Sequence, residues 1–189
     1  MSMYAIDKIR EAIMEEHEDF TKRGWKPIFR AHKEAKILIV GQAPGIKTQK
    51  KNDVFRDVSG DRLREWLGID EETFYTPQNF AVLPMDFYFP GKGKTGDLPP
   101  RKDFASRWHP LLLNEMKQIQ LIILVGTYAQ KYYLKDNMKS NLTQTVKSFG
   151  EYLPNYFPLV HPSPLNRRWE AKNPWFNEEV LPVLKLRVI

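Results

Sequence analysis

Cysteine is absent from the 189-residue sequence, which excludes disulfides, thiol catalysis and cysteine-held zinc or iron–sulfur centres. No apolar run reaches the roughly 18 residues that a membrane-spanning helix needs. The four histidines, at positions 17, 32, 109 and 161, lie far apart and show no paired metal-ligand spacing. We therefore expect no metal site, no cofactor and no membrane span.

Internal repeats and low-complexity stretches are also missing, and residues 1–20 are charged and amphipathic rather than signal-like. We therefore expect a cytoplasmic protein. The length predicts a single domain over residues 1–189, and an apolar fraction of 42% is sufficient for a substantial core. Apolar residues at helical spacing predict a helix over residues 4–20, packed on that domain.

Four short apolar runs, each followed by turn residues, predict strands buried on both faces. They cover residues 36–41, 80–83, 121–125 and 156–160. Segments with helical periodicity alternate with these runs, including one over residues 103–118. The pattern predicts a three-layer α/β/α fold around a central, mainly parallel four-stranded sheet.

Two of the predicted strands run into unusual loops. The first strand is followed by Gly41-Gln42-Ala43-Pro44-Gly45, and the last by His161-Pro162-Ser163-Pro164-Leu165-Asn166. Ligands of open α/β sheets bind at the carboxyl ends of the strands. The two loops are therefore expected to face each other across one pocket.

Positive charge is concentrated near the same sheet edge. The net charge is +6, and basic residues follow the first loop, occupy a Gly/Pro-rich middle segment and follow the last motif. These residues are Lys47, Lys50, Lys51, Lys92, Lys94, Arg101, Lys102, Arg167 and Arg168. Each cluster alone is compatible with an ordinary solvated surface, whereas three clusters at one edge favour a surface that binds phosphate.

The pair of loop motifs resembles that of the uracil-DNA glycosylase superfamily. Phe55 and the segment 57–61 extend the resemblance, which covers roughly residues 36 to 187. It implies a monomeric DNA glycosylase of base-excision repair. Such an enzyme flips uracil or another deaminated base out of DNA and hydrolyses its N-glycosidic bond with water, without a metal.

The resemblance also implies roles for individual residues. Gly41, Gln42 and Ala43 would bind the base, Phe55 would stack on it, and His161 would stabilise charge developing on its O2 atom. Ser163 would grip phosphate and Leu165 would fill the gap left by the flipped nucleotide, and the basic clusters add Lys47, Lys92 and Arg167 as expected DNA contacts. Without the resemblance, a buried, hydrogen-bonded loop histidine is the favoured interpretation of His161, and ordinary packing explains Leu165 as well as a wedge does.

Two features depart from better-known branches of the family. Ala43 stands where some branches carry the residue that positions water, and Asp57 matches a position to which that task has been assigned in others. Asp57 is also interpretable as a turn or helix cap. The asparagine that reads the base has no clear counterpart, so Asn79 and Asp86 both remain candidates.

These departures leave other functions open. One alternative is a non-catalytic module of the same fold that binds DNA or a nucleobase. Another is a hydrolase of small nucleosides, which would have a closed pocket. The long middle segment 84–100, rich in glycine, proline and lysine, is expected to be an irregular functional loop.

Overall fold

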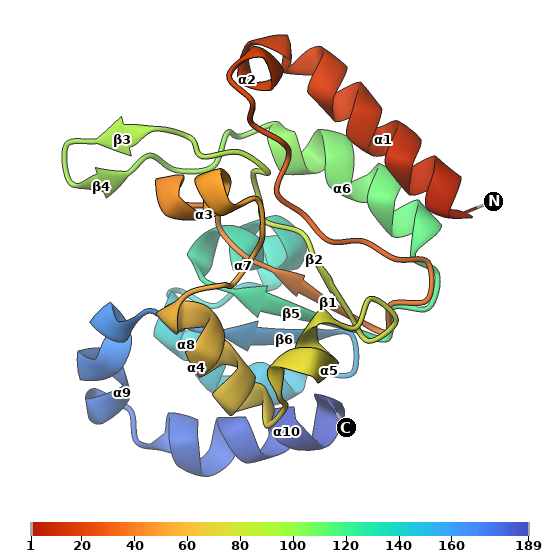
Figure 1. Cartoon of the computed structure of the whole chain (residues 1–189). Coiled ribbons are helices and arrows are strands. Elements are labelled where there is room, and N and C mark those ends of the chain that lie inside the picture. Colours follow the sequence, from red (N-terminus) through yellow and green to blue (C-terminus); the bar gives the residue numbers. More distant parts are fainter. Residues whose placement is uncertain (1, 189) are drawn as a thin grey trace.

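A four-stranded parallel sheet forms the centre of the computed structural model, which describes residues 2–188 (Figure 1). From edge to edge the strands are β2 (Phe80–Val82), β1 (Ile37–Val40), β5 (Leu121–Val125) and β6 (Tyr156–Leu159). Helices lie on both faces of this sheet, as a parallel sheet requires. The predicted three-layer α/β/α fold is confirmed.

The strand order creates a switch point between β1 and β5. From β1 the chain goes to β2 on one side, and after β2 it crosses to form β5 on the other side of β1. The loops that leave β1 and β5 therefore diverge, and a crevice opens at their carboxyl ends. Both loop motifs follow carboxyl ends of this sheet.

The alternation of side chains along β1 divides the core into two layers. Ile37 and Ile39 pack in one cluster, and Leu38 and Val40 pack in the other. The first cluster is covered by helices that come mainly from the carboxyl-terminal half of the chain. They are α4 (Val58–Leu67), α5 (Glu71–Tyr75), α8 (Leu142–Lys147), a π-helical segment (Phe176–Val180) and α10 (Leu181–Val188).

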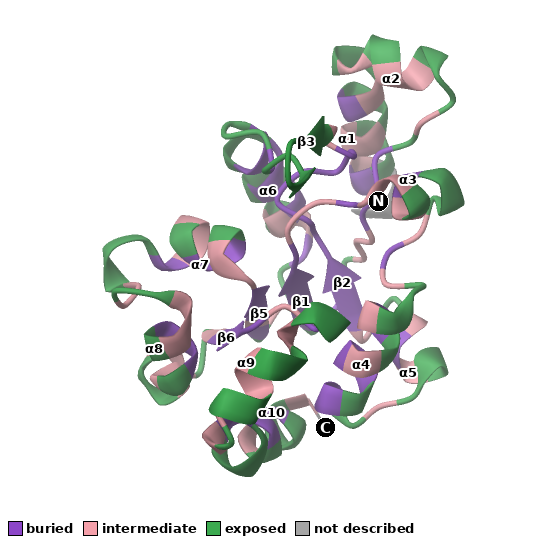
Figure 2. Ribbon diagram, turned by 90° about the vertical axis from the view of Figure 1, so that its left-hand side faces the viewer, coloured by how far each residue is buried: buried purple, intermediate pink, exposed green. Residues whose placement is uncertain are grey.

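Three helices cover the opposite face of the sheet. They are α1 (Ser2–Glu16), α6 (Phe104–Glu115) and α7 (Thr127–Leu134). Figure 2 shows the four strands of the central sheet mostly buried, while most helices expose one side and bury the other. Short helices α3 (Ile46–Lys51) and α9 (Arg167–Lys172) connect the layers to the loops at the carboxyl edge. Among residues 2–188, no helix is both long and apolar enough to cross a bilayer.

The amino-terminal helix differs from its expected extent of 4–20. It consists of α1 and a separate α2 (Glu18–Lys22), and His17 between them has φ −115° and ψ 50°, outside the helical region. The His17 ring turns onto Tyr88 and Phe104, with centroids 5.3 and 5.5 Å away. We attribute the break to this contact with residues distant in sequence.

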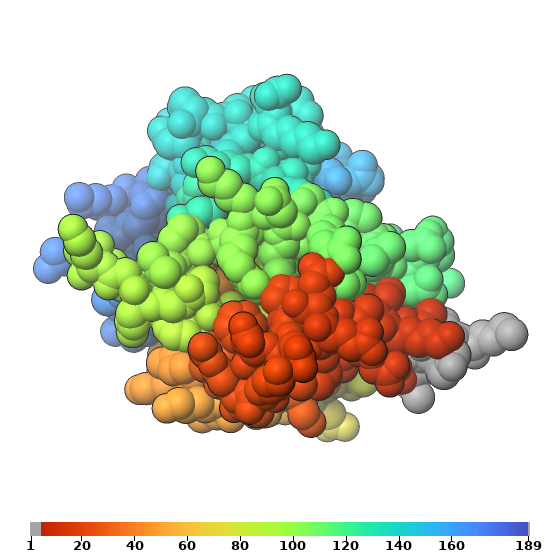
Figure 3. Space-filling view, turned by 90° about the horizontal axis from the view of Figure 1, so that it is seen from above, coloured from red at the N-terminus to blue at the C-terminus, as the bar shows by residue number. Residues whose placement is uncertain are grey.

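The middle segment 84–100 is more ordered than expected. It contains an antiparallel hairpin of β3 (Lys92–Gly93) and β4 (Gly96–Asp97). Gly91 and Gly96 have φ values of 108° and 102°, which side-chain-bearing residues rarely adopt. Figure 3 shows this yellow-green segment beside the red amino-terminal helices.

His109 is a buried histidine in α6 that is held neutral. One ring nitrogen, Nε2, lies 2.8 Å from the Pro84 carbonyl oxygen, and Nδ1 lies 2.8 Å from the Tyr133 hydroxyl. A carbonyl only accepts, so Nε2 carries the proton and Nδ1 accepts from Tyr133. Burial lowers the pKa of His109 from 6.5 to about 4.

We expect this histidine to make the protein acid-labile. Because its pKa is depressed in the folded state, its contribution to stability is complete above pH 6.5 and is lost as pH falls toward 4. At about 1.4 kcal/mol per pH unit, the loss reaches about 3 kcal/mol. Urea unfolding at several pH values should show a shallower dependence for His109→Gln than for wild type or the His32→Gln control. Equal slopes would contradict the assignment.

Candidate active site

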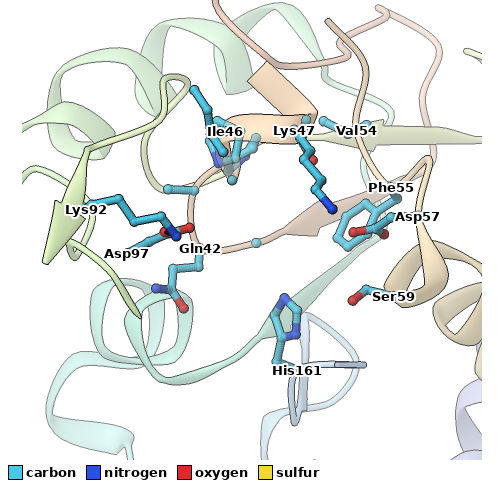
Figure 4. Close-up of a pocket in the computed structure, with 16 residues that line it drawn as sticks. Gln42, Ile46, Lys47, Val54, Phe55, Asp57, Ser59, Lys92, Asp97 and His161 are labelled. Atoms are coloured by element: carbon cyan, nitrogen blue, oxygen red, sulfur yellow. Dashed lines mark ion pairs between the residues drawn. The ribbon is translucent and has the colours of Figure 1, made fainter. Parts of the chain in front are cut away.

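A cavity of about 460 Å³ opens at the carboxyl edge of the sheet (Figure 4). The loop after β1 and the loop after β6 both contribute to it, so the structure brings the two motifs together. The third contribution comes from the β3–β4 hairpin. The lining residues are Gly41, Gln42, Ala43, Pro44, Gly45, Ile46, Lys47, Thr48, Val54, Phe55, Asp57, Ser59, Pro84, Lys92, Asp97 and His161.

The first loop is fixed by backbone hydrogen bonds. The Gly41 carbonyl accepts from the Met85 amide at 2.9 Å, and the Gln42 carbonyl accepts from the Asp86 amide at 3.2 Å. These bonds continue the pairing of β1 with the segment after β2. Gly45 then begins α3, and its carbonyl accepts from the Gln49 amide at 2.9 Å. The loop is therefore held at both ends.

Phe55 forms an aromatic wall of the cavity. Its ring packs edge-on against Phe74, with centroids 6.2 Å apart, and approaches the backbone of Gly41. Its φ of 53° is unusual for a residue with a bulky side chain. A Cβ on Gly60 would lie 1.8 Å from the Phe55 carbonyl oxygen, so only glycine allows this close approach.

Asp57 both caps a helix and lines the cavity. Its Oδ1 accepts from the Gly60 amide at 3.0 Å, which makes it the N-cap of α4. Figure 4 shows its carboxylate at the cavity wall, next to Phe55 and Ser59. The two interpretations of Asp57 drawn from the sequence are therefore compatible with one another.

His161 points its ring into the cavity from the opposite loop (Figure 4). The Ser163 amide donates to Nδ1 at 3.1 Å, so the proton of the neutral ring is on Nε2. Burial lowers the pKa of His161, and the negative charge of Asp57 offsets part of that shift. The residue is thus a neutral imidazole with one N–H to donate.

The His161 loop is braced by Arg62 of α4, a residue that sequence reasoning missed. Its Nη1 donates to the Ser163 carbonyl at 3.2 Å, and its Nη2 pairs with Glu170 of α9. Asp57 begins the same helix, so α4 ties the two loops to each other. No local pattern in the sequence could have signalled a contact between residues 101 positions apart.

A comparison with protein-family models matches residues 29–185 to the uracil DNA glycosylase superfamily. That range includes both loops, the hairpin and all four strands of the sheet. The chain belongs to the uracil DNA glycosylase superfamily. Membership supports, in general terms, a glycosylase that acts on DNA in repair.

Two candidate base-reading residues do not reach the cavity of this superfamily member. Asn79 precedes β2, at the amino edge of the sheet, where its Nδ2 donates to the Thr73 carbonyl at 3.2 Å. Asp86 is fully buried and its carboxylate accepts from the Tyr88 amide and from Arg101. Neither side chain is available to a base. Asn79 lies at the opposite edge of the sheet from the cavity, and the Asp86 carboxylate is already paired with Arg101.

The residues expected to contact DNA fall into two groups in this glycosylase fold. Lys47 and Lys92 line the cavity, and Lys47 extends toward Phe55 and Asp57 (Figure 4). The others belong to the His161 loop and the start of α9: Ser163 caps a short 3-10 turn by accepting from the Leu165 amide at 3.2 Å, and Arg167 is exposed. Leu165 itself is 89% exposed.

Within residues 2–188, no three His, Asp or Glu side chains gather closely enough to hold an ion. Asp97 and Ser59 are further lining residues that were not predicted. The sequence offered one sign that Asp97 could reach the site. Gly91 and Gly96 beside it predict a tight turn, and such a turn can fold back over the first loop.

Proposed function

We propose that this protein excises uracil or another deaminated base from DNA. The observation that carries the proposal is the convergence of Phe55, Asp57 and His161 on one cavity. Its volume of about 460 Å³ lies within the usual range of small-molecule pockets, about 300 to 1,000 Å³. The flipped base would stack on Phe55, with backbone groups of Gly41 and Ala43 and the side chain of Gln42 beside it.

Bond cleavage would separate charge across the cavity. As the bond between C1′ of the sugar and the base nitrogen breaks, its electron pair goes to the base and the sugar becomes cationic. Nε2–H of His161 would donate to the base oxygen on which negative charge accumulates. Asp57 would orient a water molecule toward C1′, accept its proton and stabilise the cationic sugar.

Excision of a base from oligonucleotides tests the proposal directly. Purified protein is incubated with single-stranded and duplex DNA containing one uracil, hypoxanthine or xanthine, and alkali then cleaves any abasic site. We expect cleavage at the damaged position together with release of the free base. Absence of cleavage with all three bases in both strand forms would contradict the enzymatic proposal.

A non-catalytic DNA-binding module is the second candidate, and Ala43 favours it. Ala43 lines the cavity, but its methyl side chain has no polar atom to orient water. Such a module would bind DNA with an affinity that falls steeply with salt, and would leave no abasic product. The oligonucleotide assay separates the two candidates when it is paired with a binding titration at several salt concentrations.

Leu165→Ala is expected to weaken excision from duplex DNA more than from single strands. An exposed apolar side chain on a Pro-flanked turn is suited to occupy the space of a flipped nucleotide in a base stack. We expect a loss of about 10-fold in duplex and little change in single strands, measured as kcat/KM. The matched control is Leu186→Ala, because Leu186 is 75% exposed on α10. Equal losses on both substrates would argue against a wedge.

A further inference from the structure

The β3–β4 hairpin brings an ion pair to the cavity. Lys92 Nζ lies 2.8 Å from Asp97 Oδ1, and both side chains line the cavity on the side away from Phe55 and Asp57 (Figure 4). Asp97 also approaches the first loop, because its Oδ2 lies 3.6 Å from where a Cβ on Gly45 would be. The pair thus lies beside Gln42 and within reach of the same ligand.

Buried contacts at both ends fix the hairpin in this position. Before it, the Phe89 amide donates to Oε1 of Gln49 on α3 at 2.9 Å, and Gln49 is 1% exposed. After it, Arg101 donates from Nε and Nη2 to the fully buried Asp86 carboxylate at 2.7 and 2.8 Å. The Leu98 amide closes the hairpin on the Gly91 carbonyl at 2.8 Å. These contacts fix the backbone that carries the pair, while the Lys92 side chain is 69% exposed and the Asp97 side chain 35% exposed.

An ion pair of this kind has a fixed hydrogen-bonding polarity. A carboxylate only accepts hydrogen bonds and an ammonium group only donates them, whereas an amide can reverse its two ends. Deamination reverses the polarity of a base edge. Cytosine presents an acceptor at N3 beside an amino donor, and uracil presents N3–H beside the O4 acceptor. Adenine and hypoxanthine differ in the same way at N1 and position 6.

We infer that Asp97 and Lys92 read the deaminated edge of the flipped base. Asp97 accepts from the ring N–H, and Lys92 donates to the neighbouring carbonyl oxygen. The inference rests on the proposed glycosylase function. It assigns to Asp97 and Lys92 the recognition of the base that neither Asn79 nor Asp86 can perform. It names a substrate class, uracil and hypoxanthine over cytosine and adenine. It does not separate uracil from thymine, which presents the same edge.

Asp97→Asn is the decisive variant because it keeps the shape and removes the fixed polarity. Single-turnover excision is measured on single-stranded DNA containing uracil or cytosine. We expect the uracil rate to fall about 10- to 100-fold, as for loss of a hydrogen bond to a charged group, and the uracil-to-cytosine rate ratio to fall with it. Asp103→Asn, an exposed aspartate outside the cavity, is the control and should change neither quantity.

Lys92→Gln tests the second half of the pair against a simpler role in binding phosphate. A reading role predicts a slower uracil rate with an unchanged salt dependence of DNA binding. A phosphate contact predicts a shallower salt dependence and equal losses on all bases, which would overturn the inference. Lys117→Gln is the control, since Lys117 is exposed just after α6, outside the basic clusters, and does not line the cavity.

Failure of the inference is distinguishable from failure of the proposed function. If wild type excises uracil and Asp97→Asn keeps both the rate and the ratio, the reading role is wrong and the glycosylase proposal stands. If wild type excises nothing, the glycosylase proposal is wrong. Calorimetric titration with free uracil and free cytosine then decides the reading role: a preference for uracil that Asp97→Asn abolishes supports it, and its absence overturns it.

Discussion

Replacement of His161 by alanine is expected to slow base excision about 100- to 1,000-fold, as for loss of one donor to a developing oxyanion. The hydrogen bond from the Ser163 amide leaves Nε2–H as the single donor of the neutral ring, and that ring points into the cavity. Affinity for DNA should change little, because the bond strengthens only as the base acquires charge. Single-turnover rates and a binding titration measure the two effects separately.

Two further variants divide the roles of the two ring nitrogens. His161→Asn retains an acceptor for the Ser163 amide but is too short to reach the base, so it should be as slow as alanine. His161→Gln places an amide donor deeper in the cavity and should recover part of the rate. His32→Ala is the control, since His32 Nδ1 accepts from the Glu34 amide at 3.2 Å in the same local pattern outside the cavity. Full activity of His161→Asn would contradict the proposed donor.

The pH dependence of excision provides a second check on this residue. Burial lowers the pKa of His161, so the ring is already neutral at pH 7. The rate should therefore not fall between pH 7 and pH 9 through loss of a proton from His161. A fall in this range that His161→Gln abolishes would show that the charged imidazolium is the active form.

The sheet could be predicted from the sequence because its signals are local. Each strand lies in a short apolar run that ends at turn residues, and burial on both faces makes such runs nearly continuous. The positions of the two loop motifs followed from strand direction alone, since carboxyl ends of parallel strands meet at one edge. Phe55, Asp57 and His161 line one cavity for that reason.

Other parts of the site depend on contacts that no local pattern reveals. Asp86 looked available until the structure showed its pairing with Arg101, fifteen positions further on. The Arg62 brace and the Gln49 anchor connect segments that are far apart in the chain. The break at His17 depends on rings of Tyr88 and Phe104. Residues of this kind hold or exclude the functional side chains, and they became visible only with the fold.

Asp57→Asn is expected to lower the excision rate about 100- to 10,000-fold, the range attributed to a positioned general base. Asparagine is as good an N-cap as aspartate, so the hydrogen bond to the Gly60 amide and the start of α4 should be preserved. Asp70→Asn is the matched control, because Asp70 caps α5 through the Thr73 amide at 2.8 Å and does not line the cavity. Thermal unfolding should show similar small changes for both variants.

The same substitution has a readout that does not require turnover. The negative charge of Asp57 raises the pKa of His161 and so opposes the effect of burial. Removing that charge should lower the pKa of His161 further, which an NMR titration of the imidazole ring detects, whereas Asp70→Asn should leave it unchanged. A slower enzyme with a lowered His161 pKa would support a carboxylate that faces both the histidine and the reacting sugar. Full activity of Asp57→Asn would contradict its role with water, and an unchanged His161 pKa would contradict the electrostatic coupling across the cavity.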